Sequence, residues 1–239
     1  MNKIQAPLSA FLLPALAICL ITLVVPATAQ HFGFGPHVRD GFRLGGTSMW
    51  VTDPVNPGNK VIRMDVTVAT FGTVKRALDW GTQVEDLTSQ LSFNFRFAAG
   101  GSCGGGSPRI QLAIDVNGDG TSDGNAFGYT GPFPNFIGCP ADTWLFEDLT
   151  SNAQRWDLAQ FDAELGGIGQ PASNALCGSF VCTWSQVLTV FGNFPNHRAL
   201  TATLVDDTYG GSPRSIGFAY YDNIELGDEK LQNPTGRHH

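Results

Sequence analysis

The sequence predicts a mostly antiparallel β fold, of the sandwich or barrel type, with one short helix. Apolar and polar residues alternate strictly over residues 91–97, and the same period of two recurs at residues 61–70, 110–115, 200–204 and 216–220. Such alternation is typical of strands that bury one face. Asp- and Gly-rich turns separate these segments. About 210 residues follow an N-terminal leader, which is enough for one domain of this kind.

Residues 1–29 have the layout of a secretory signal peptide. Lys3 precedes an apolar run over residues 11–25, and residues 26–29 supply the small side chains that signal peptidase requires. We therefore expect cleavage before Gln30 and a secreted, extracellular protein. The formal charge of the chain is −7, and loss of Lys3 makes it −8.

The charge and hydropathy of the remaining chain exclude two classes of partner. A net negative charge disfavours binding to nucleic acid. Beyond the leader, the sequence has no second apolar segment that approaches the length of a membrane-spanning helix. We therefore expect neither nucleic acid nor membrane insertion.

Three parts are expected after the signal peptide. Residues 30–46 are rich in Gly and aromatic side chains without a clean period, which indicates a loose N-terminal arm or an edge segment. Residues 47–227 contain the alternating segments and form the β-sandwich domain. Residues 228–239 are polar and carry charges of both signs, so a flexible C-terminal tail is expected there.

One segment of the domain departs from the strand pattern. Its apolar residues recur at helical spacing, at Trp184, Val187, Leu188 and Phe191. Thr183 is placed to cap the N-terminus, and Gly192-Asn193 is placed to end the helix. The sequence therefore predicts a short helix that packs over one edge of a sheet.

The cysteines predict two disulfides. Loss of Cys19 with the leader leaves an even number, at Cys103, Cys139, Cys177 and Cys182. An exported chain meets an oxidising compartment, where such cysteines pair. Of the three possible pairings we favour a local Cys177–Cys182 loop together with Cys103–Cys139. A four-cysteine metal site is the rival interpretation, but it lacks paired CxxC spacing.

Residues 115–123, with the sequence DVNGDGTSD, present side-chain oxygens at alternate positions. The candidate metal ligands are Asp115, Asn117, Asp119 and Asp123. Calcium takes oxygen ligands of this kind, so a structural calcium ion is one interpretation. The pattern departs from the EF-hand, because its twelfth position is Ala126 where the EF-hand has Glu. The alternative is a plain hairpin turn, for which Asn-Gly and Asp-Gly are preferred. The sequence leaves both open.

No catalytic residue is predicted. A G-x-S-x-G match places Ser102 between two predicted strands and beside a cysteine, whereas a nucleophile elbow requires a helix to follow. A glycosidase needs two facing carboxylates. The available glutamates, which no common motif joins, are Glu85, Glu147, Glu164 and Glu225.

Aromatic side chains are the better candidates for a binding site, because their rings stack on sugar faces. Trp144 and Trp156 flank a polar, Asp-rich region of the sequence. We expect these two tryptophans, together with Tyr129, to contact a ligand.

Parts of the sequence resemble known secreted proteins. The run from Cys103 through residues 104–120, together with Gly138-Cys139-Pro140, is similar to a group of secreted bacterial β-sandwich proteins of unassigned role. The ending YYDNIEL at residues 220–226 resembles the last strand of jelly-roll carbohydrate-binding modules and other lectin-like sandwiches. The likeness covers mainly residues 90–226. It implies a jelly-roll-like β-sandwich whose concave sheet or edge loops bind glycan, often beside a structural calcium ion.

The observations favour a secreted, non-catalytic protein that binds extracellular or cell-surface glycan. A second interpretation is a structural or adhesive protein that self-associates, with the arm from His31 pairing with the sheet edge of a second copy. A third is a glycan-active hydrolase, which two carboxylates facing each other across a cleft would indicate.

Overall fold

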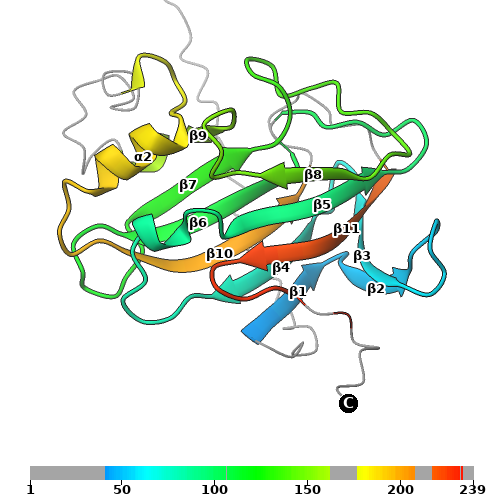
Figure 1. Ribbon diagram of the computed structural model, residues 1–239, viewed down its shortest axis with the longest axis horizontal. Coiled ribbons are helices and arrows are strands. Elements are labelled where there is room, and N and C mark those ends of the chain that lie inside the picture. The colour runs from blue at the N-terminus through cyan, green and yellow to red at the C-terminus, as the bar shows by residue number, and fades with distance from the viewer. Residues whose placement is uncertain (1–40, 106, 162–176, 208–216, 232, 234–239) are drawn as a thin grey trace, which may run out of the picture. The chain divides into compact units, whose positions relative to one another are not determined.

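The structure is a computed structural model that describes residues 41–105, 107–161, 177–207, 217–231 and 233. Within these ranges eleven strands form two sheets, and every strand pair in the two sheets is antiparallel (Figure 1). The described part of the chain contains one α-helix. The prediction of an antiparallel β-sandwich with one short helix is therefore confirmed, and the jelly-roll connectivity stays a prediction.

The chain crosses several times between the two sheets. Sheet A has the order β1-β4-β10-β6-β7-β9, with bounds Phe42–Gly46, Gly72–Ala77, Arg198–Asp206, Arg109–Asp115, Gly124–Tyr129 and Arg155–Asp157. Sheet B has the order β2-β3-β11-β5-β8, with bounds Met49–Thr52, Lys60–Val66, Gly217–Leu226, Leu91–Phe97 and Leu145–Asp148. Two short 3₁₀ helices, η2 and η3, span Glu85–Leu87 and Ala159–Phe161.

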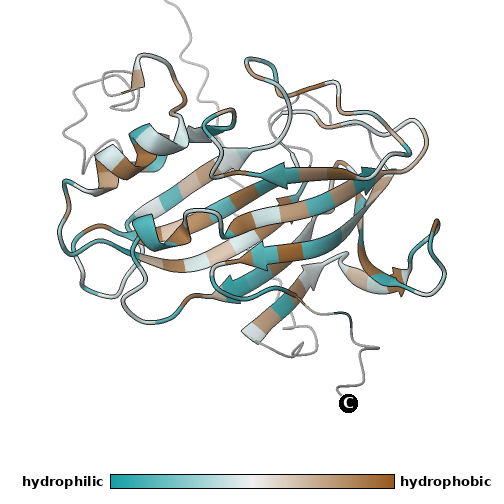
Figure 2. Ribbon diagram, viewed as in Figure 1, coloured by the Kyte–Doolittle hydropathy of each residue, from teal (hydrophilic) through white to brown (hydrophobic). Residues whose placement is uncertain are grey.

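Strand β5 shows how the alternating pattern builds the core. Its apolar residues are buried between the sheets, at Leu91, Phe93, Phe95 and Phe97. Adjacent rings pack in a chain, with centroid distances of 5.8 Å for Phe93–Phe95 and 5.4 Å for Phe95–Phe97. Each buried Phe contributes about 1.5–3 kcal/mol to folding. Figure 2 shows the same alternation of hydropathy along neighbouring strands.

Helix α2 (Trp184–Phe191) confirms the helix that the sequence predicts. Thr183 is the N-cap, and its hydroxyl and backbone N–H form a capping box with Gln186. The helix packs through its aromatic residues, with a ring-centroid distance of 5.2 Å both for Trp184–Trp156 and for Phe191–Phe161. It therefore covers the β9 edge of sheet A.

Both disulfides have the predicted pairing. Cys103–Cys139 joins the β5–β6 connection to the β7–β8 connection, with a Cα–Cα distance of 5.3 Å. Cys177–Cys182 closes a short loop that leads into α2, with a Cα–Cα distance of 5.0 Å. The two bonds thus constrain loops, whereas the strands are held by the core.

The domain extends beyond the expected bounds at both ends. Residues 42–46, which we expected in a loose N-terminal arm or an edge segment, form β1 at the edge of sheet A. Past residue 227, Leu231 is buried and its N–H donates to the carbonyl of Ile224, so the first part of the expected tail belongs to the folded domain. The expected signal peptide and residues 30–40 of the arm lie outside the described residues. None of the described helices is long and apolar enough to cross a membrane.

Candidate functional site

The structure does not bring the three predicted ligand-binding aromatics together. Trp156 is fully buried in β9, and its indole N–H donates to the carbonyl of Leu149 at 2.8 Å. Its large apolar ring fills the core beside α2, so the expectation that Trp156 contacts a ligand is corrected. Tyr129 is half-buried in β7 and donates its hydroxyl to Asp157 at 3.0 Å. Trp144 lies apart from both, immediately before β8, and is half-buried.

The predicted calcium loop is closed by its own backbone. Asp115 is fully buried, and its Oδ1 accepts N–H bonds from Asn117 at 3.1 Å and Gly118 at 2.6 Å. Its Oδ2 accepts the N–H of Gly120 at 2.7 Å. Burial alone would raise the pKa of this carboxyl, but the N–H groups of Gly120 and its neighbours outweigh burial and the pKa lies below its usual value.

The other three candidate ligands make bonds of the same kind. Asp123 accepts the N–H of Val116 at 2.8 Å and the amide of Asn117 at 3.3 Å. The side-chain oxygen of Asn117 accepts the N–H of Asp119 at 2.9 Å, and Asp119 accepts that of Thr121 at 2.7 Å. No group of three carboxylate, His or Cys side chains that could hold a metal ion occurs in the part of the chain that the structure describes. The residues present therefore do not fit a calcium site in this conformation, and calcium stays a prediction.

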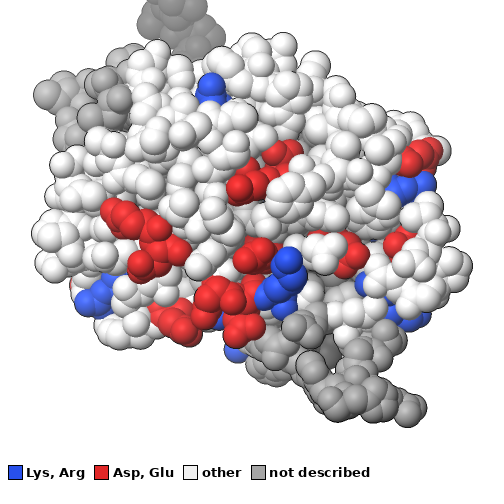
Figure 3. All heavy atoms as spheres, viewed as in Figure 1, with Lys and Arg blue, Asp and Glu red and all other residues white. Residues whose placement is uncertain are grey.

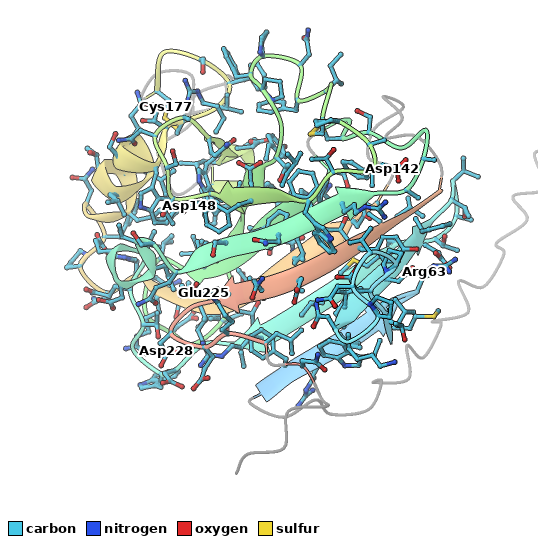
Figure 4. The ribbon with its side chains drawn as sticks, turned by 45° about the vertical axis from the view of Figure 1, so that its right-hand side comes forward. Arg63, Asp142, Asp148, Cys177, Glu225 and Asp228 are labelled. Carbon is cyan, nitrogen blue, oxygen red and sulfur yellow. A yellow bond between two sulfur atoms is a disulfide. The ribbon has the colours of Figure 1, made fainter. Side chains whose placement is uncertain are left out.

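The outer face of sheet B is the best candidate for a ligand site. We use this name for the side chains of β3, β5, β8 and β11 that point away from the core: Arg63, Asp65, Ser92, Asn94, Arg96, Phe146, Asp148, Phe218, Tyr220, Asp222 and Glu225. The alternation of burial along β5 and β11 places them there, since the residues between them are buried. Figure 4 labels Asp148 and Glu225 near one end of this face and Arg63 near the other.

The strand register sets aromatic and polar groups side by side on this face. Phe146 lies opposite Asn94, and Asn94 lies opposite Asp222, so an aromatic ring, an amide and a carboxylate cross three strands in one row. In the next row Arg96 lies opposite Tyr220, which lies opposite Arg63. From strand spacing and rise, Phe146 and Tyr220 are about 12 Å apart. The two rings therefore span at least two sugar units.

The rings of this face are accessible. Phe146 is 66% exposed, and Tyr220 and Phe218 are half-buried. Tyr220 and Phe218 pack edge to face at 5.5 Å, and the Arg63 guanidinium lies 4.0 Å from the centroid of Phe218. Trp144 precedes β8 by one residue, so the alternation that exposes Phe146 directs Trp144 to the same side of the strand. Of the predicted aromatics, Trp144 is the one next to this face.

Polar groups between the rings supply donors and acceptors. Asp222 accepts the amide N–H of Asn59 at 3.0 Å, and Ser92 donates to Glu225 at 3.4 Å. Arg96 pairs with Asp142 at 2.8 Å. Its Nε is buried without a hydrogen-bond partner among the described residues. A ligand that is rich in hydroxyl groups therefore meets both hydrogen-bond donors and acceptors on this face.

The charge of the outer face of sheet B is negative. Its cations are already neutralised, because Arg63 pairs with Asp65 at 2.7 Å, Arg96 pairs with Asp142, and Lys230 lies 3.8 Å from Glu225. Asp148 accepts hydrogen bonds from Thr150 and makes no ion pair with a described residue. On the face that Figure 3 shows, acidic side chains outnumber basic ones.

Glu147 is the carboxyl with the most unusual acidity. It lies in β8, opposite the core residue Phe93, and accepts a hydrogen bond from Gln154. Burial and, to a smaller extent, the charge of Asp148 raise its pKa, whereas hydrogen bonds from Gln154 and the N–H of Gly131 lower it, and the net pKa is about 7. A pKa near 7 suits a general acid. Asp148, the adjacent carboxylate, points to the opposite side of the strand, so the two do not face each other across a cleft as glycosidase chemistry requires.

The remaining candidate carboxylates have structural partners. Glu85 lies 2.9 Å from His197 Nε2, and Glu225 is bound by Ser92. Glu164 lies outside the described residues. Ser102 donates its hydroxyl to the carbonyl of Cys139, next to the disulfide.

Sequence reasoning missed most of the outer face of sheet B. The alternation at residues 91–97 already marked Asn94 and Arg96 as outward-facing. Strand β8 has only four residues and is too short to show a period of two, so the sequence did not mark Phe146 as outward-facing. Tyr220 lies in a predicted strand, but only the pairing with β5 and β3 shows which residues lie beside it.

Comparison of the chain with known proteins gives no relative. No family model, no curated protein and no solved structure matches it. The geometry of the site therefore carries the functional argument.

Proposed function

We propose that this protein is a secreted, non-catalytic binding protein that holds extracellular or cell-surface glycan on the outer face of sheet B. The observation that carries the proposal is the row of Phe146, Asn94 and Asp222 beside Tyr220, in which accessible rings alternate with amide, carboxylate and guanidinium groups. The fold is proposed to be of the jelly-roll type that carbohydrate-binding modules share.

The pattern of this face suits a glycan better than a protein or a lipid. Apart from the Tyr220–Phe218 pair, the described rings of this face are separated by polar side chains, so the apolar area is smaller than protein and membrane contacts need. A sugar ring offers an apolar face to Phe146 or Tyr220 and hydroxyls to Asn94, Asp222 and Arg96. All five groups lie on paired strands, so little conformational entropy is lost on binding.

The charges define the class of glycan. An acidic polysaccharide would meet the carboxylates of Asp148, Asp222 and Glu225, while the described arginines of this face, Arg63 and Arg96, are already paired with carboxylates. Like charges at these distances repel. The ligand is therefore proposed to be an uncharged or amine-bearing polysaccharide.

Secretion is part of the same proposal. The signal peptide predicted at residues 1–29 directs export, and two disulfides form and persist in an oxidising compartment. A glycan outside the cell is then the ligand that the protein meets.

The test is retention of protein from Gln30 onward on insoluble cellulose, chitin, chitosan and polygalacturonate. We expect retention on at least one of the first three, no retention on polygalacturonate, and about a tenfold loss in the Phe146→Ala/Tyr220→Ala double variant, which corresponds to about 1.4 kcal/mol. A Phe71→Ala variant, which removes another exposed ring, is the matched control. No retention of the wild type, with concentration-dependent assembly instead, would select the adhesive interpretation.

The calcium loop is tested in the same experiment, with calcium in one buffer and chelator in the other. A melting temperature and retention that are equal in both buffers identify residues 115–123 as a turn closed by backbone N–H groups. A loss in chelator establishes the ion.

A further inference from the structure

Trp80 is a tryptophan that the fold places outside the core. Its side chain is 76% exposed, whereas Trp156 and Trp184 are 0% and 3% exposed. It lies in the turn after β4 in which the N–H of Thr82 donates to the carbonyl of Asp79 at 3.1 Å. Gly81 has a φ of 96°, the positive value that the third position of such a turn favours. The backbone conformation of this turn therefore directs the Trp80 ring into solvent.

The Trp80 ring is nevertheless fixed in place. The guanidinium carbon of Arg198 lies 4.2 Å from the ring centroid, which is a close cation–π contact. Arg198 begins β10 and lies opposite Asp115 of β6 in the strand register, so the contact anchors the ring to sheet A. Arg198 Nη1 is buried and has no hydrogen-bond partner within the described residues. One face of the Trp80 ring is thus covered by the Arg198 guanidinium, whose Nη1 lies beneath the ring without a partner among the described residues.

The loop of residues 116–123 stands beside the ring. A Cβ placed on Gly120 would lie 3.6 Å from Cη2 of Trp80, so loop and ring are in contact distance. The loop exposes an amide, a carboxylate and two hydroxyls, at Asn117, Asp119, Thr121 and Ser122. The N–H bonds to Asp115 fix its backbone, so these groups are presented in one arrangement.

We propose that Trp80, Arg198 and the loop of residues 116–123 form a second glycan site, separate from the outer face of sheet B. In this site Arg198 supports one face of Trp80, the free face of the ring stacks on a sugar ring, and the polar side chains of the loop bind the hydroxyls of the sugar. The choice of ligand class rests on the proposed function. A lone ring among polar groups is too small an apolar area for a protein partner, and its rigid surroundings suit a small polar ligand.

The two sites lie on different elements, which has a consequence for binding. The outer face of sheet B is built from β3, β5, β8 and β11, whereas the Trp80 site is built from the β4–β5 and β6–β7 connections and the start of β10. A polymer that reaches both sites binds through both, and its retention exceeds that of either site alone. The chain then acts as a bivalent binder of polysaccharide.

The test compares Trp80→Ala with Trp80→Phe, which keeps a ring, and with Val68→Ala, which truncates another highly exposed apolar side chain. Retention is measured on insoluble cellulose, chitin and chitosan, with circular dichroism as the check on folding. We expect about a tenfold loss of retention for Trp80→Ala, a smaller loss for Trp80→Phe and none for Val68→Ala. In the wild type, soluble hexamers of the retained polymer also change the tryptophan fluorescence, and Trp80→Ala removes most of this change.

The outcomes separate the two proposals. Wild-type retention by Trp80→Ala, with a loss in Phe146→Ala/Tyr220→Ala, overturns the second site and leaves the proposed function standing. Loss in Trp80→Ala with full retention by the double variant places the glycan at Trp80 and overturns the assignment to the outer face of sheet B. Failure of the wild type to bind any of the three polymers overturns both.

Discussion

Replacing Glu147 by Gln is expected to stabilise the protein at alkaline pH and to leave it unchanged at acidic pH. Burial raises the pKa of this carboxyl from 4.5 to about 7. Between these two values the folded protein holds a proton that the unfolded chain has released, so stability falls as the pH rises through this window. The penalty is absent below pH 4.5 and fully present above pH 7.

The size of the effect follows from the same two pKa values. Their difference corresponds to about 3 kcal/mol, and partial access of water to Glu147 lowers this to about 1–3 kcal/mol. In the Glu147→Gln variant the side-chain carbonyl still accepts the hydrogen bond of Gln154, so only the buried charge is lost. At pH 8 the variant is therefore expected to be more stable than the wild type by this amount.

Urea unfolding at pH 4.5 and pH 8, followed by tryptophan fluorescence, measures the effect. Glu229→Gln is the matched control, because Glu229 is exposed and the same change there should alter stability equally little at both pH values. We expect the Glu147 variant to differ from the wild type by less than about 0.5 kcal/mol at pH 4.5. A stability difference of the same size at both pH values, or a variant that is less stable at pH 8, would refute the reasoning.

Three further variants probe the core, the helix cap and the loop. Phe95→Ala leaves a cavity between the sheets and should lower the free energy of unfolding by about 3–5 kcal/mol; a loss under 1 kcal/mol would contradict its core position. Thr183→Ala removes the capping box of α2 and should cost about 1 kcal/mol in the same urea assay, with Thr189→Ala at an exposed position of the same helix as the control. Asp115→Ala leaves three N–H groups without their acceptor and should lower the free energy of unfolding by about 2–4 kcal/mol. Asp119→Ala frees one exposed N–H and should lower it by less than about 1 kcal/mol. Equal losses of stability would show that the buried carboxylate does not hold the loop.

The sequence predicted those parts of the fold whose signal is local. Residues 91–97 alternate because one side of β5 is buried, and that period is readable without any partner strand. Helix α2 was predicted with its N-cap because the capping box and the helical spacing lie within ten residues. The Cys177–Cys182 pair was similarly favoured by its short separation.

Features that depend on distant residues were not predictable in the same way. Strands β8 and β9 have four and three residues, too few to show a period. Trp156 occurs in a polar stretch of sequence, yet it is buried because α2 and β7 converge on it. The raised pKa of Glu147 arises from its burial in the folded protein, and neither the helical nor the strand pattern contains that information.

The assignment of glycan binding to the outer face of sheet B is tested most directly by NMR. Uniformly ¹⁵N-labelled protein is titrated with cellohexaose, xylohexaose and chitohexaose, and the backbone amides are followed. We expect that one of these sugars shifts the amides of Asn94, Phe146 and Tyr220, while those of Gln111 and Thr203 on the outward side of sheet A stay unchanged. Shifts confined to sheet A, or none with any of the three sugars, would contradict it.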